Sequence, residues 1–356
     1  MSRPLLPDDL DTPAVLIDLA AVEANLRRAQ AHADALGLRL RPHVKTHKLP
    51  RFARRQVELG AVGITAQKIG EAEAMVDGGV GDVFIPYNIL GRSKLARLRA
   101  LAGRCALSVG ADGPETVAGY AEAFADARAP LPVLVEIDTG ARRCGVGDPE
   151  AALALARAID RAPGLVFRGL FTYPPKDGVE TVEAALAEAK ARIEAAGLPV
   201  AVVSNGGTPG LRRAGEVRSA TEHRPGTYIY NDRMQVGWGA AGWGDCALTV
   251  RATVVSRPAP DRAVLDAGSK ALAADPVPGG GHGRVVEHPE AVIASLSEEH
   301  AVVDLSRSPT RPRVGDRVSV IPNHACVVSN LFDAVHLVEG GRVVEALPVA
   351  ARGRMS

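Results

Sequence analysis

The feature that most constrains the fold is a regular alternation of short β-rich runs with alanine-rich helical segments between about residues 11 and 230. Strands and helices that alternate at this pitch are joined by crossovers and form parallel sheets. Roughly eight such units over some 220 residues favour a closed (β/α)8 TIM-type barrel, with an open doubly wound sheet as the alternative. The expected strands begin with AVLIDL (14–19) and end with TYIY (227–230).

After about residue 240 the helical segments largely stop, and valine-rich runs follow, separated by Gly, Pro and Asp turns. This pattern predicts a β-rich domain. We therefore expect a barrel over 11–235 and a β-rich domain over 236–356 that also includes residues 1–10. The least regular stretch of that domain, DPVPGGGHGRVVEHPE (275–290), is expected to be a surface linker, with a mobile lid as the alternative.

The charges nearly cancel, with 42 basic against 41 acidic residues and a net charge of +1, which gives no electrostatic reason to expect nucleic acid as a partner. The start of the chain does not resemble a signal peptide. No apolar run approaches the roughly 20 residues needed to span a bilayer. The four cysteines are scattered and form no CxxC pair. These features predict a soluble protein of the reducing cytoplasm.

Lysine is scarce, yet two lysines stand close together in RPHVKTHKLP (41–50). Lys45 follows a predicted early strand, and functional groups of such barrels lie at the carboxyl ends of the strands. We expect Arg41, His43, His47 and Lys48 to lower the pKa of Lys45, because neighbouring cations disfavour its charged form. Lys48 is expected to be solvated. The alternative for the whole stretch is a solvated basic patch.

Two glycine-containing loops follow the last predicted strands, SNGGTPG (204–210) and HRPGTY (223–228). Glycines at a strand-to-loop junction present backbone N–H groups to an anion with little steric obstruction. A lysine on one strand end and a phosphate cradle on another predict pyridoxal phosphate bound as a Schiff base. Ordinary turns are the alternative.

The segment VEIDTGARRCGV (135–146) delivers Glu136 and Asp138 on a strand and then two arginines after a glycine turn. One of these arginines, Arg142 or Arg143, is placed to donate a hydrogen bond to an anionic oxygen on the cofactor ring. A solvated arginine pair is the alternative.

In IPNHACVVSN (321–330), His324 and Cys326 are two residues apart on a predicted strand, so their side chains should share one face. Imidazole and thiolate suit Zn²⁺, and two protein ligands would leave positions open for water or substrate. Structural burial of both residues is the alternative.

The motifs RPHVKTHK, DTGARRCGV, SNGGTPG, HRPGTYIYND, LDAGSKALAAD, LSEEH and PNHACVVSNL occur in an order that resembles D-serine dehydratases and D-threonine aldolases. These are fold-type III pyridoxal phosphate enzymes with an alanine-racemase-like barrel. The resemblance runs from about residue 11 to the C-terminus. One departure is PPKDG after Tyr173, where relatives often carry a Gly-His pair.

The resemblance implies that Lys45 forms the Schiff base and acts as general base, with Tyr173 near the substrate. It implies that His324 and Cys326 hold a divalent metal, zinc with manganese or magnesium as alternatives. It also implies a homodimer in which the C-terminal β domain closes over a barrel. The cofactor-binding residues that it implies are Arg143, Ser204, Gly206, Gly207, Thr208, Gly226 and Tyr228.

The implied activity is a pyridoxal phosphate- and metal-dependent lyase that acts on small β-hydroxy-D-amino acids. We favour a D-serine dehydratase-like reaction that gives pyruvate and ammonia, because the His-x-Cys pattern resembles the dehydratases and thiolate suits zinc. The alternatives are D-threonine aldolase-type cleavage to glycine and an aldehyde, an amino-acid racemase, and a non-catalytic cofactor-binding protein.

Overall fold

The computed structural model describes residues 5–356, and its contacts divide the chain into two compact units. One unit, the barrel unit, comprises residues 28–45, 49–226 and 353–356. The other, the β unit, comprises the residues up to Arg27 together with 46–48 and 227–352. The unit boundary near the start of the chain falls inside helix α1 (Leu19–Ala35).

The barrel unit is built on an eight-stranded parallel sheet in the order β2-β9-β8-β7-β6-β5-β4-β3. A parallel bridge between His43 and Thr65 joins the segment after β2 to β3, which closes the ring and confirms the predicted barrel. The strands are β2 (Arg39–Leu40), β3 (Ile64–Thr65), β4 (Asp82–Ile85), β5 (Ala106–Ala111), β6 (Leu131–Glu136), β7 (Leu165–Phe171), β8 (Val202–Asn205) and β9 (Glu222–His223).

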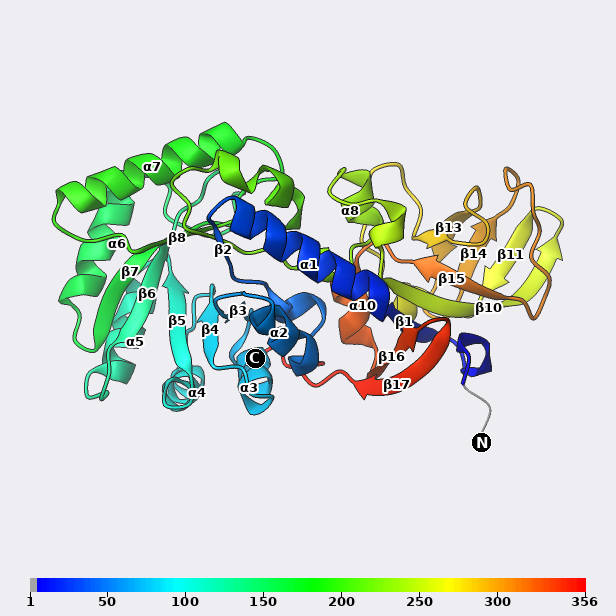
Figure 1. Ribbon diagram of the computed structural model, residues 1–356, viewed down its shortest axis with the longest axis horizontal. Helices are drawn as coiled ribbons and strands as arrows, with labels where there is room; N and C mark the ends of the chain where they lie inside the picture. The colour runs from blue at the N-terminus through cyan, green and yellow to red at the C-terminus, as the bar shows by residue number, and fades with distance from the viewer. Residues whose placement is uncertain (1–4) are drawn as a thin grey trace. The chain divides into compact units, whose positions relative to one another are not determined.

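Helices cover the outside of this sheet, and successive helices pack against one another in sequence order (Figure 1). Helix α6 shows why these segments are helical: Asp148 caps its first turn through a hydrogen bond from the N–H of Ala151 (2.8 Å), and proline occupies its first position. The helices are α2 (Pro50–Glu58), α3 (Ile69–Asp77), α4 (Arg92–Ala102), α5 (Pro114–Phe124), α6 (Pro149–Arg161) and α7 (Val179–Ala195), with 3-10 segments η2 (Val44–Thr46) and η3 (Thr208–Glu216).

The inside of the barrel is filled by large apolar side chains, among them Phe84, Leu134 and Phe171. The rings of Phe84 and Phe171 meet edge to face, with centroids 5.3 Å apart and planes at 86°. Burying each such ring contributes about 2 kcal/mol to stability. This packed floor supports the loops at the carboxyl ends of the strands.

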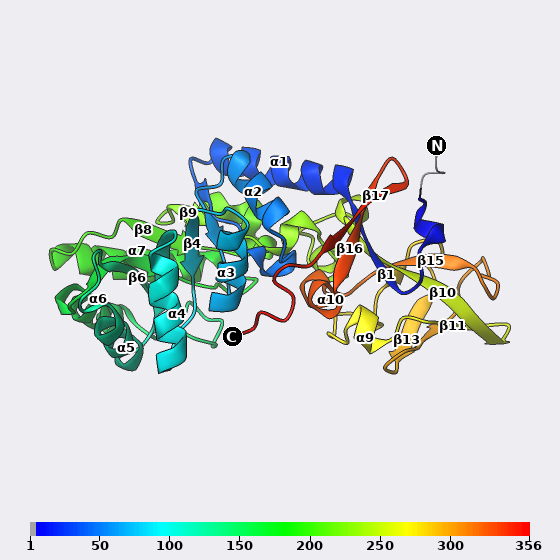
Figure 2. The ribbon, with the colours of Figure 1, turned by 90° about the horizontal axis from the view of Figure 1, so that it is seen from below.

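The β unit contains a nine-stranded sheet whose main path runs β13-β14-β11-β10-β1-β16-β17. Figure 2 shows β1 beside β16, a parallel pair, and β17 antiparallel to β16. The strands are β1 (Ala14–Asp18), β10 (Leu248–Ala259), β11 (Arg262–Leu265), β12 (Arg284–Val285), β13 (Val292–Leu296), β14 (Ala301–Asp304), β15 (Arg317–Ile321), β16 (Ala334–Glu339) and β17 (Arg342–Pro348).

Short helices complete the β unit and connect its strands. They are η1 (Pro7–Asp9), η4 (Thr227–Ile229), α8 (Arg233–Gly237), η5 (Trp243–Asp245), α9 (Ser269–Leu272) and α10 (Ala325–Leu331).

Two predicted barrel strands lie elsewhere in the structure. AVLIDL forms β1, which pairs with β10 and β16, so this segment belongs to the β unit and not to a barrel starting at residue 11. TYIY forms the 3-10 turn η4, and the last barrel strand is β9. Val15, Leu16 and Ile17 are all buried, and a fully apolar run does not reveal which sheet it joins. Residues 1–4 of the predicted β-rich domain lie outside the described residues.

Within the described part of the chain, none of the helices is long and apolar enough to cross a membrane. The four cysteines are all free thiols.

Candidate active site

Lys45 lies in η2, directly beyond the carboxyl end of β2, and is half-buried. Its backbone N–H donates to Nδ1 of His43 at 3.3 Å. The N–H of His43 in turn donates to the carbonyl of Pro225 at 2.9 Å. The lysine turn is therefore tied to the loop after β9, which carries Gly226.

Two of the basic residues near Lys45 are paired or buried in the structure. Arg41 forms ion pairs with Glu222, at 3.1 Å, and with Asp82. Lys48 was expected to be solvated, and this is wrong: it is 8 % exposed, in a backbone conformation with φ of 58°. Its carbonyl accepts a hydrogen bond from the N–H of Ala351 (3.1 Å), which holds the turn in packed structure.

The two glycine loops meet as the cradle prediction requires. The N–H of Gly226 donates to Oγ1 of Thr208 at 3.2 Å, so the loops after β8 and β9 are bonded to each other. Gly207 is the residue before η3, whose first residue is Thr208. Backbone N–H groups at this turn are the donors that an anion would use.

Gly206 has a φ of +108°, and a Cβ added there would lie 2.0 Å from Cε1 of His223. Only glycine fits this position, because both the conformation and the space exclude a side chain. His223 is buried, and its Nε2 lies 3.1 Å from the carbonyl oxygen of Gly207. Burial lowers the pKa of His223 to about 4, so the ring is neutral and donates Nε2–H to that carbonyl.

Two further members of the expected cofactor set, Ser204 and Tyr228, are buried in the structure. Ser204 is fully buried in β8, and its hydroxyl bonds to Glu222 and accepts from Nη1 of Arg224 at 2.6 Å. Its hydroxyl is therefore bonded to both Glu222 and Arg224, and the expected role of Ser204 in cofactor binding stays a prediction. Tyr228 is buried in η4 and belongs to the β unit.

Arg143 is the arginine of the 142–143 pair that faces other site residues. Its guanidinium lies 4.3 Å above the centroid of the Tyr173 ring, and its Nη2 is 4.0 Å from Oε1 of Glu136. A Cβ on Gly207 would lie 3.7 Å from Cε2 of Tyr173, so Tyr173 connects Arg143 to the cradle. A guanidinium held this way can donate to an anionic oxygen at the barrel mouth.

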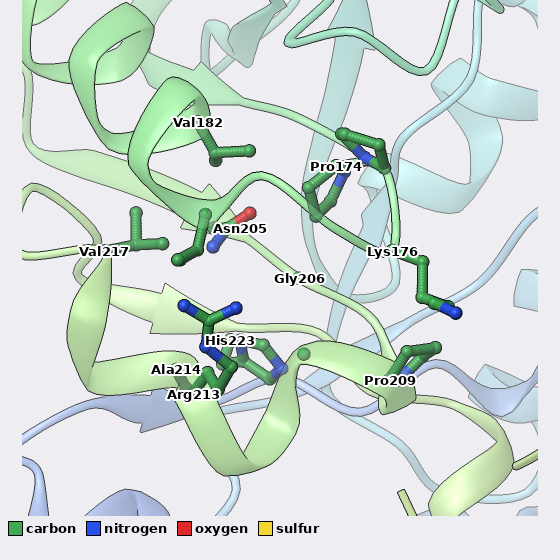
Figure 3. Close-up of a pocket in the computed structure, with 13 residues that line it drawn as sticks. Pro174, Lys176, Val182, Asn205, Gly206, Pro209, Arg213, Ala214, Val217 and His223 are labelled. Atoms are coloured by element: carbon green, nitrogen blue, oxygen red, sulfur yellow. The ribbon is translucent and has the colours of Figure 1, made fainter. Parts of the chain in front are cut away.

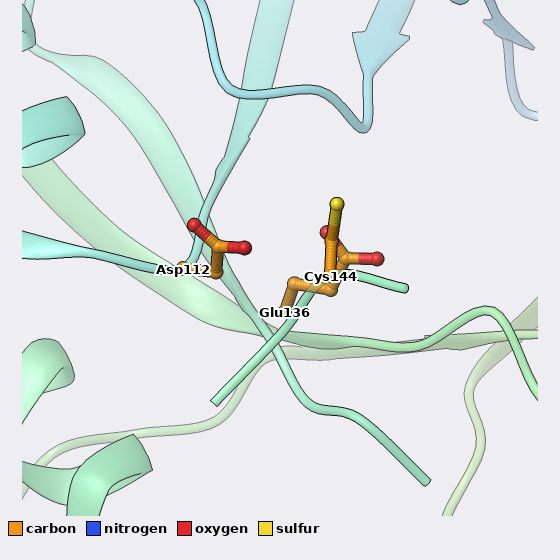
Figure 4. A group of neighbouring side chains, drawn as sticks. All are labelled: Asp112, Glu136 and Cys144. Carbon is orange, nitrogen blue, oxygen red and sulfur yellow. The ribbon is translucent and has the colours of Figure 1, made fainter. Parts of the chain in front are cut away.

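Glu136, the last residue of β6, lies with Asp112 and Cys144 in a group whose ligand atoms are all within 4.8 Å of one another (Figure 4). Asp112 accepts from Nδ2 of Asn88 (2.7 Å) and from the N–H of Gly145 (2.9 Å), so it braces the loop after β6. Burial raises the pKa of Glu136 to about 7, against the opposing charge of Arg143. The group fixes the loop that carries Arg143.

Sequence reasoning missed Arg224, which follows β9 directly. Arg224 is 5 % exposed, and it donates to Ser204 Oγ and to the carbonyl of Thr172, both at 2.6 Å. Its guanidinium lies 5.8 Å from the centroid of the Phe84 ring and 5.5 Å from that of Phe171. Burial lowers its pKa to about 10. The sequence signal that could have identified Arg224 is its position directly before Pro-Gly at the end of a strand.

A pocket with about 410 Å³ of empty space lies between the loop after β7, the start of α7 and η3 (Figure 3). Pro174, Asn205, Pro209 and His223 are among its lining residues. Within the described residues its lining does not include Lys45 or Arg143. The pocket therefore lies on the side of the cradle backbone that His223 supports, apart from the lysine.

In the β unit, the predicted strand at His324 and Cys326 is wrong. Strand β15 ends at Ile321, and after Pro322 and Asn323 the chain enters helix α10, with His324 as the residue before its first turn. Proline removes a backbone donor and ends the strand ladder. The two side chains nevertheless meet, because Cys326 is a side-chain hydrogen-bond partner of His324.

The groups around this pair fit a divalent metal. Burial lowers the pKa of His324, but hydrogen bonds and charge from Cys326 and Asp275 outweigh it and raise that pKa to about 10. The thiol of Cys326 also contacts the hydroxyls of Thr46 (3.1 Å) and Thr227 (3.5 Å). An imidazole beside a thiol is a donor set of structural and catalytic zinc sites.

The family described as "Alanine racemase, N-terminal domain" matches residues 17–234, and the one described as "Putative serine dehydratase domain" matches residues 247–338. D-threonine aldolase of an Arthrobacter species is 36 % identical over 97 % of this chain and 93 % of its own length. D-threo-3-hydroxyaspartate dehydratase of a Delftia species is 32 % identical over 91 % of this chain and 93 % of its own.

Among solved structures, D-threonine aldolase from Filomicrobium marinum superposes with a TM-score of 0.93 at 33 % identity and covers 100 % of both chains. A cysteine-to-alanine mutant of D-threo-3-hydroxyaspartate dehydratase, in the metal-free form, gives a TM-score of 0.89 at 30 % identity over 98 % of this chain and 99 % of that one.

A barrel with a lysine at its mouth and a glycine cradle, matched over residues 17–234, defines an enzyme of the alanine-racemase-like fold. Within that class the chain belongs to the family of D-threonine aldolase and D-threo-3-hydroxyaspartate dehydratase, and it is a lyase.

Proposed function

We propose that this chain is a pyridoxal phosphate- and divalent metal-dependent lyase of β-hydroxy-D-amino acids, and that its principal reaction is dehydration. The observation that carries the proposal is the bonded barrel mouth. The Lys45 turn is joined to the Gly226 loop through His43 and Pro225, and that loop is joined to Thr208 of the cradle. One phosphorylated cofactor with an aldehyde would use both the amine and the cradle.

In the barrel unit, some residues would bind the cofactor and Lys45 would transfer a proton. The N–H groups of Gly207 and Thr208 would bind the phosphate, and the Arg143 guanidinium would face an anionic ring oxygen. Pyridoxal phosphate bound there supplies an electron sink for the charge that develops at the substrate α-carbon. The amine of Lys45 would take the α-proton of the substrate as general base.

In the β unit, His324 and Cys326 would hold the metal, and a bound divalent metal supplies Lewis acidity to a hydroxyl. Two protein ligands leave coordination positions for that hydroxyl and for water. Thiolate is a soft ligand that favours zinc over magnesium or manganese. The metal-free cysteine-to-alanine mutant of the related dehydratase supports a ligand role for a cysteine in this family.

The imidazole–thiol pair favours dehydration, because it suits zinc. Zinc is a strong Lewis acid, and hydroxide is a poor leaving group that needs one. Loss of the α-proton and of hydroxide from D-serine would give pyruvate and ammonia after hydrolysis. Aldol cleavage is the second candidate, and the similarity to two D-threonine aldolases, at 36 % and 33 % identity, favours it. There the β-hydroxyl loses its proton, the Cα–Cβ bond breaks, and glycine and an aldehyde leave.

One assay series tests these assignments. Purified protein is incubated with D-serine, D-threonine and D-threo-3-hydroxyaspartate, with and without EDTA, and the products are identified. The proposal predicts 2-oxo acid and ammonia, lost on chelation and restored by Zn²⁺. Glycine plus acetaldehyde from D-threonine would assign the aldolase reaction instead. Racemisation that EDTA leaves untouched would contradict both.

We further propose that the enzyme works as a homodimer, which rests on the family resemblance. Light scattering of the cofactor-loaded protein should give twice the mass of the 37.1 kDa chain.

A further inference from the structure

We infer that Asp275 is a positioning residue of the metal centre: its carboxylate holds Nδ1 of His324 and thereby presents Nε2 to the cation. The inference rests on the metal site of the proposed function. The contact that carries it is direct, with Oδ1 of Asp275 2.9 Å from Nδ1 of His324.

The chemistry of the two groups sets the direction of this hydrogen bond. An ionised carboxylate only accepts, so Nδ1 of His324 carries the proton and donates. Metal binding requires His324 to give up its second proton, and an imidazole that keeps its proton on Nδ1 then has its lone pair on Nε2. The remaining nitrogen is therefore the one available to a divalent metal beside Cys326. Carboxylates that hold metal-binding imidazoles in this way fix the ring orientation and increase its basicity.

Asp275 itself is held in place by a buried neighbour of His324. Asn323 is 2 % exposed, and its Nδ2 donates to the backbone carbonyls of Asp275 (2.8 Å) and Gly281 (2.9 Å). Its Oδ1 accepts from Nη1 of Arg233 at 3.1 Å. One side chain thus anchors both ends of the 275–281 segment next to the residue that would bind the metal.

The other side of the turn is fixed by α8. Asp232 accepts from the N–H of Ala325 at 3.0 Å, and the N–H of Met234 donates to the carbonyl of Asn323 at 3.2 Å. The backbone at His324 is therefore held from both sides, so the orientation left to determine is that of the ring. Asp275 determines it.

The geometry favours an indirect role for Asp275 over a role as a third metal ligand. Within the described residues, Asp275, His324 and Cys326 do not form a group whose ligand atoms all lie within 4.8 Å of one another. The carboxylate of Asp275 is already bonded to Nδ1 of His324. Asp275 consequently acts on the metal through His324.

The test measures Zn²⁺ affinity of the cofactor-loaded protein by competition with a chromophoric chelator. Five proteins are compared: wild type, Asp275→Ala, Asp275→Asn, His324→Ala, and Asp304→Asn as a control for an aspartate in the same unit. Asp275→Ala should bind Zn²⁺ about 10- to 100-fold more weakly, the usual effect of removing such a partner. Asp275→Asn should fall between, because an amide oxygen still accepts from Nδ1–H without the charge.

A second readout separates positioning from a general structural role. The unfolding temperature is measured without metal and with excess Zn²⁺ for each variant. A positioning role leaves the metal-free value at that of wild type and reduces only the increase that Zn²⁺ causes, because bound ligand stabilises in proportion to its affinity. A lowered metal-free value with unchanged Zn²⁺ affinity would overturn the inference.

The same series distinguishes this inference from the proposed function. If His324→Ala loses Zn²⁺ while both Asp275 variants keep wild-type affinity, the positioning role is overturned and the metal site stands. If His324→Ala binds Zn²⁺ as wild type does, the metal site is overturned and the positioning role with it.

Discussion

The imidazole of His223 occupies the space that a side chain at Gly206 would need, 2.0 Å from the position of its Cβ. The ring also lies 3.1 Å, through Nε2, from the carbonyl of Gly207. A neutral histidine therefore packs against the backbone of the glycine loop, and only glycine at position 206 leaves room for its ring.

Replacing Gly206 with alanine should displace the cradle and weaken pyridoxal phosphate binding. The added methyl forces either the His223 ring or the loop to move, in a backbone conformation that alanine adopts only with strain. We expect at least about tenfold weaker binding, equivalent to roughly 1.4 kcal/mol, measured by fluorescence titration of the cofactor-free protein.

Gly210→Ala is the matched control for this change. A Cβ at Gly210, four residues further in the same loop region, meets no atom within 4 Å. Equal cofactor affinity in the two alanine variants would show that the contact with His223 does not shape the cradle.

Arg143→Ala should remove the cation that stacks on Tyr173 and faces Glu136. We expect a shifted cofactor absorbance and a fall in kcat/KM of about 10²-fold, the usual range for removing one charged contact to the reacting system. Arg143→Lys should not restore activity, because an ammonium cannot reproduce the planar fork or the stacking. Arg142→Ala is the control, and a loss as large as that of Arg143→Ala would reverse the assignment of the two arginines.

The barrel and the β-rich half were predictable because both follow from local patterns in the sequence. Repeated strand–helix units define the barrel, and valine runs without helices define the sheet. The placement of β1 was not predictable, since Val15, Leu16 and Ile17 are buried whichever sheet receives them. Its partners β10 and β16 are about 230 and 320 residues away in sequence, and only long-range pairing decides between them.

The positions of the candidate site residues divide in the same way. Lys45 and the glycine loops were predicted to follow strand ends by a rule of the fold, and the structure places them there. Their roles stay predictions. The hydrogen bond between Ser204 and Arg224 was not predictable, because it belongs to a buried network of residues from different strands. Asp275 lies 49 residues from His324, and no spacing rule connects them.

The stability of the cofactor-free protein should fall as pH rises from about 4.5 to about 7, through Glu136. Its pKa is raised to about 7 by burial, so the folded state binds the proton more tightly than the unfolded state does. The folded protein consequently loses stability as that proton leaves, by about 1–3 kcal/mol after allowance for partial solvation.

Urea unfolding of wild type and Glu136→Gln at pH 5 and pH 8 measures this effect. The glutamine stays neutral, so the difference in unfolding free energy between the two proteins should change by that amount across the range. A constant difference would show that Glu136 has an ordinary pKa in the folded state.

Cys326→Asp should change the preferred metal. A carboxylate is a harder ligand than a thiolate, so affinity should shift from zinc toward manganese and magnesium. We expect the ratio of Zn²⁺ to Mn²⁺ affinity to fall by about tenfold or more, measured by competition titration. Cys246→Asp, at a cysteine outside the site, is the control, and an unchanged ratio in Cys326→Asp would remove Cys326 from the ligand set.

The central claim is that Lys45 carries the cofactor. Borohydride reduction of the cofactor-loaded enzyme fixes the linkage, and peptide mass spectrometry then locates the modified lysine. We predict a pyridoxyl group on Lys45 alone. In Lys45→Ala, both the pyridoxyl group and the visible absorbance of the cofactor should be absent. Modification of Lys48 or Lys270, or a coloured and active Lys45→Ala protein, would contradict it.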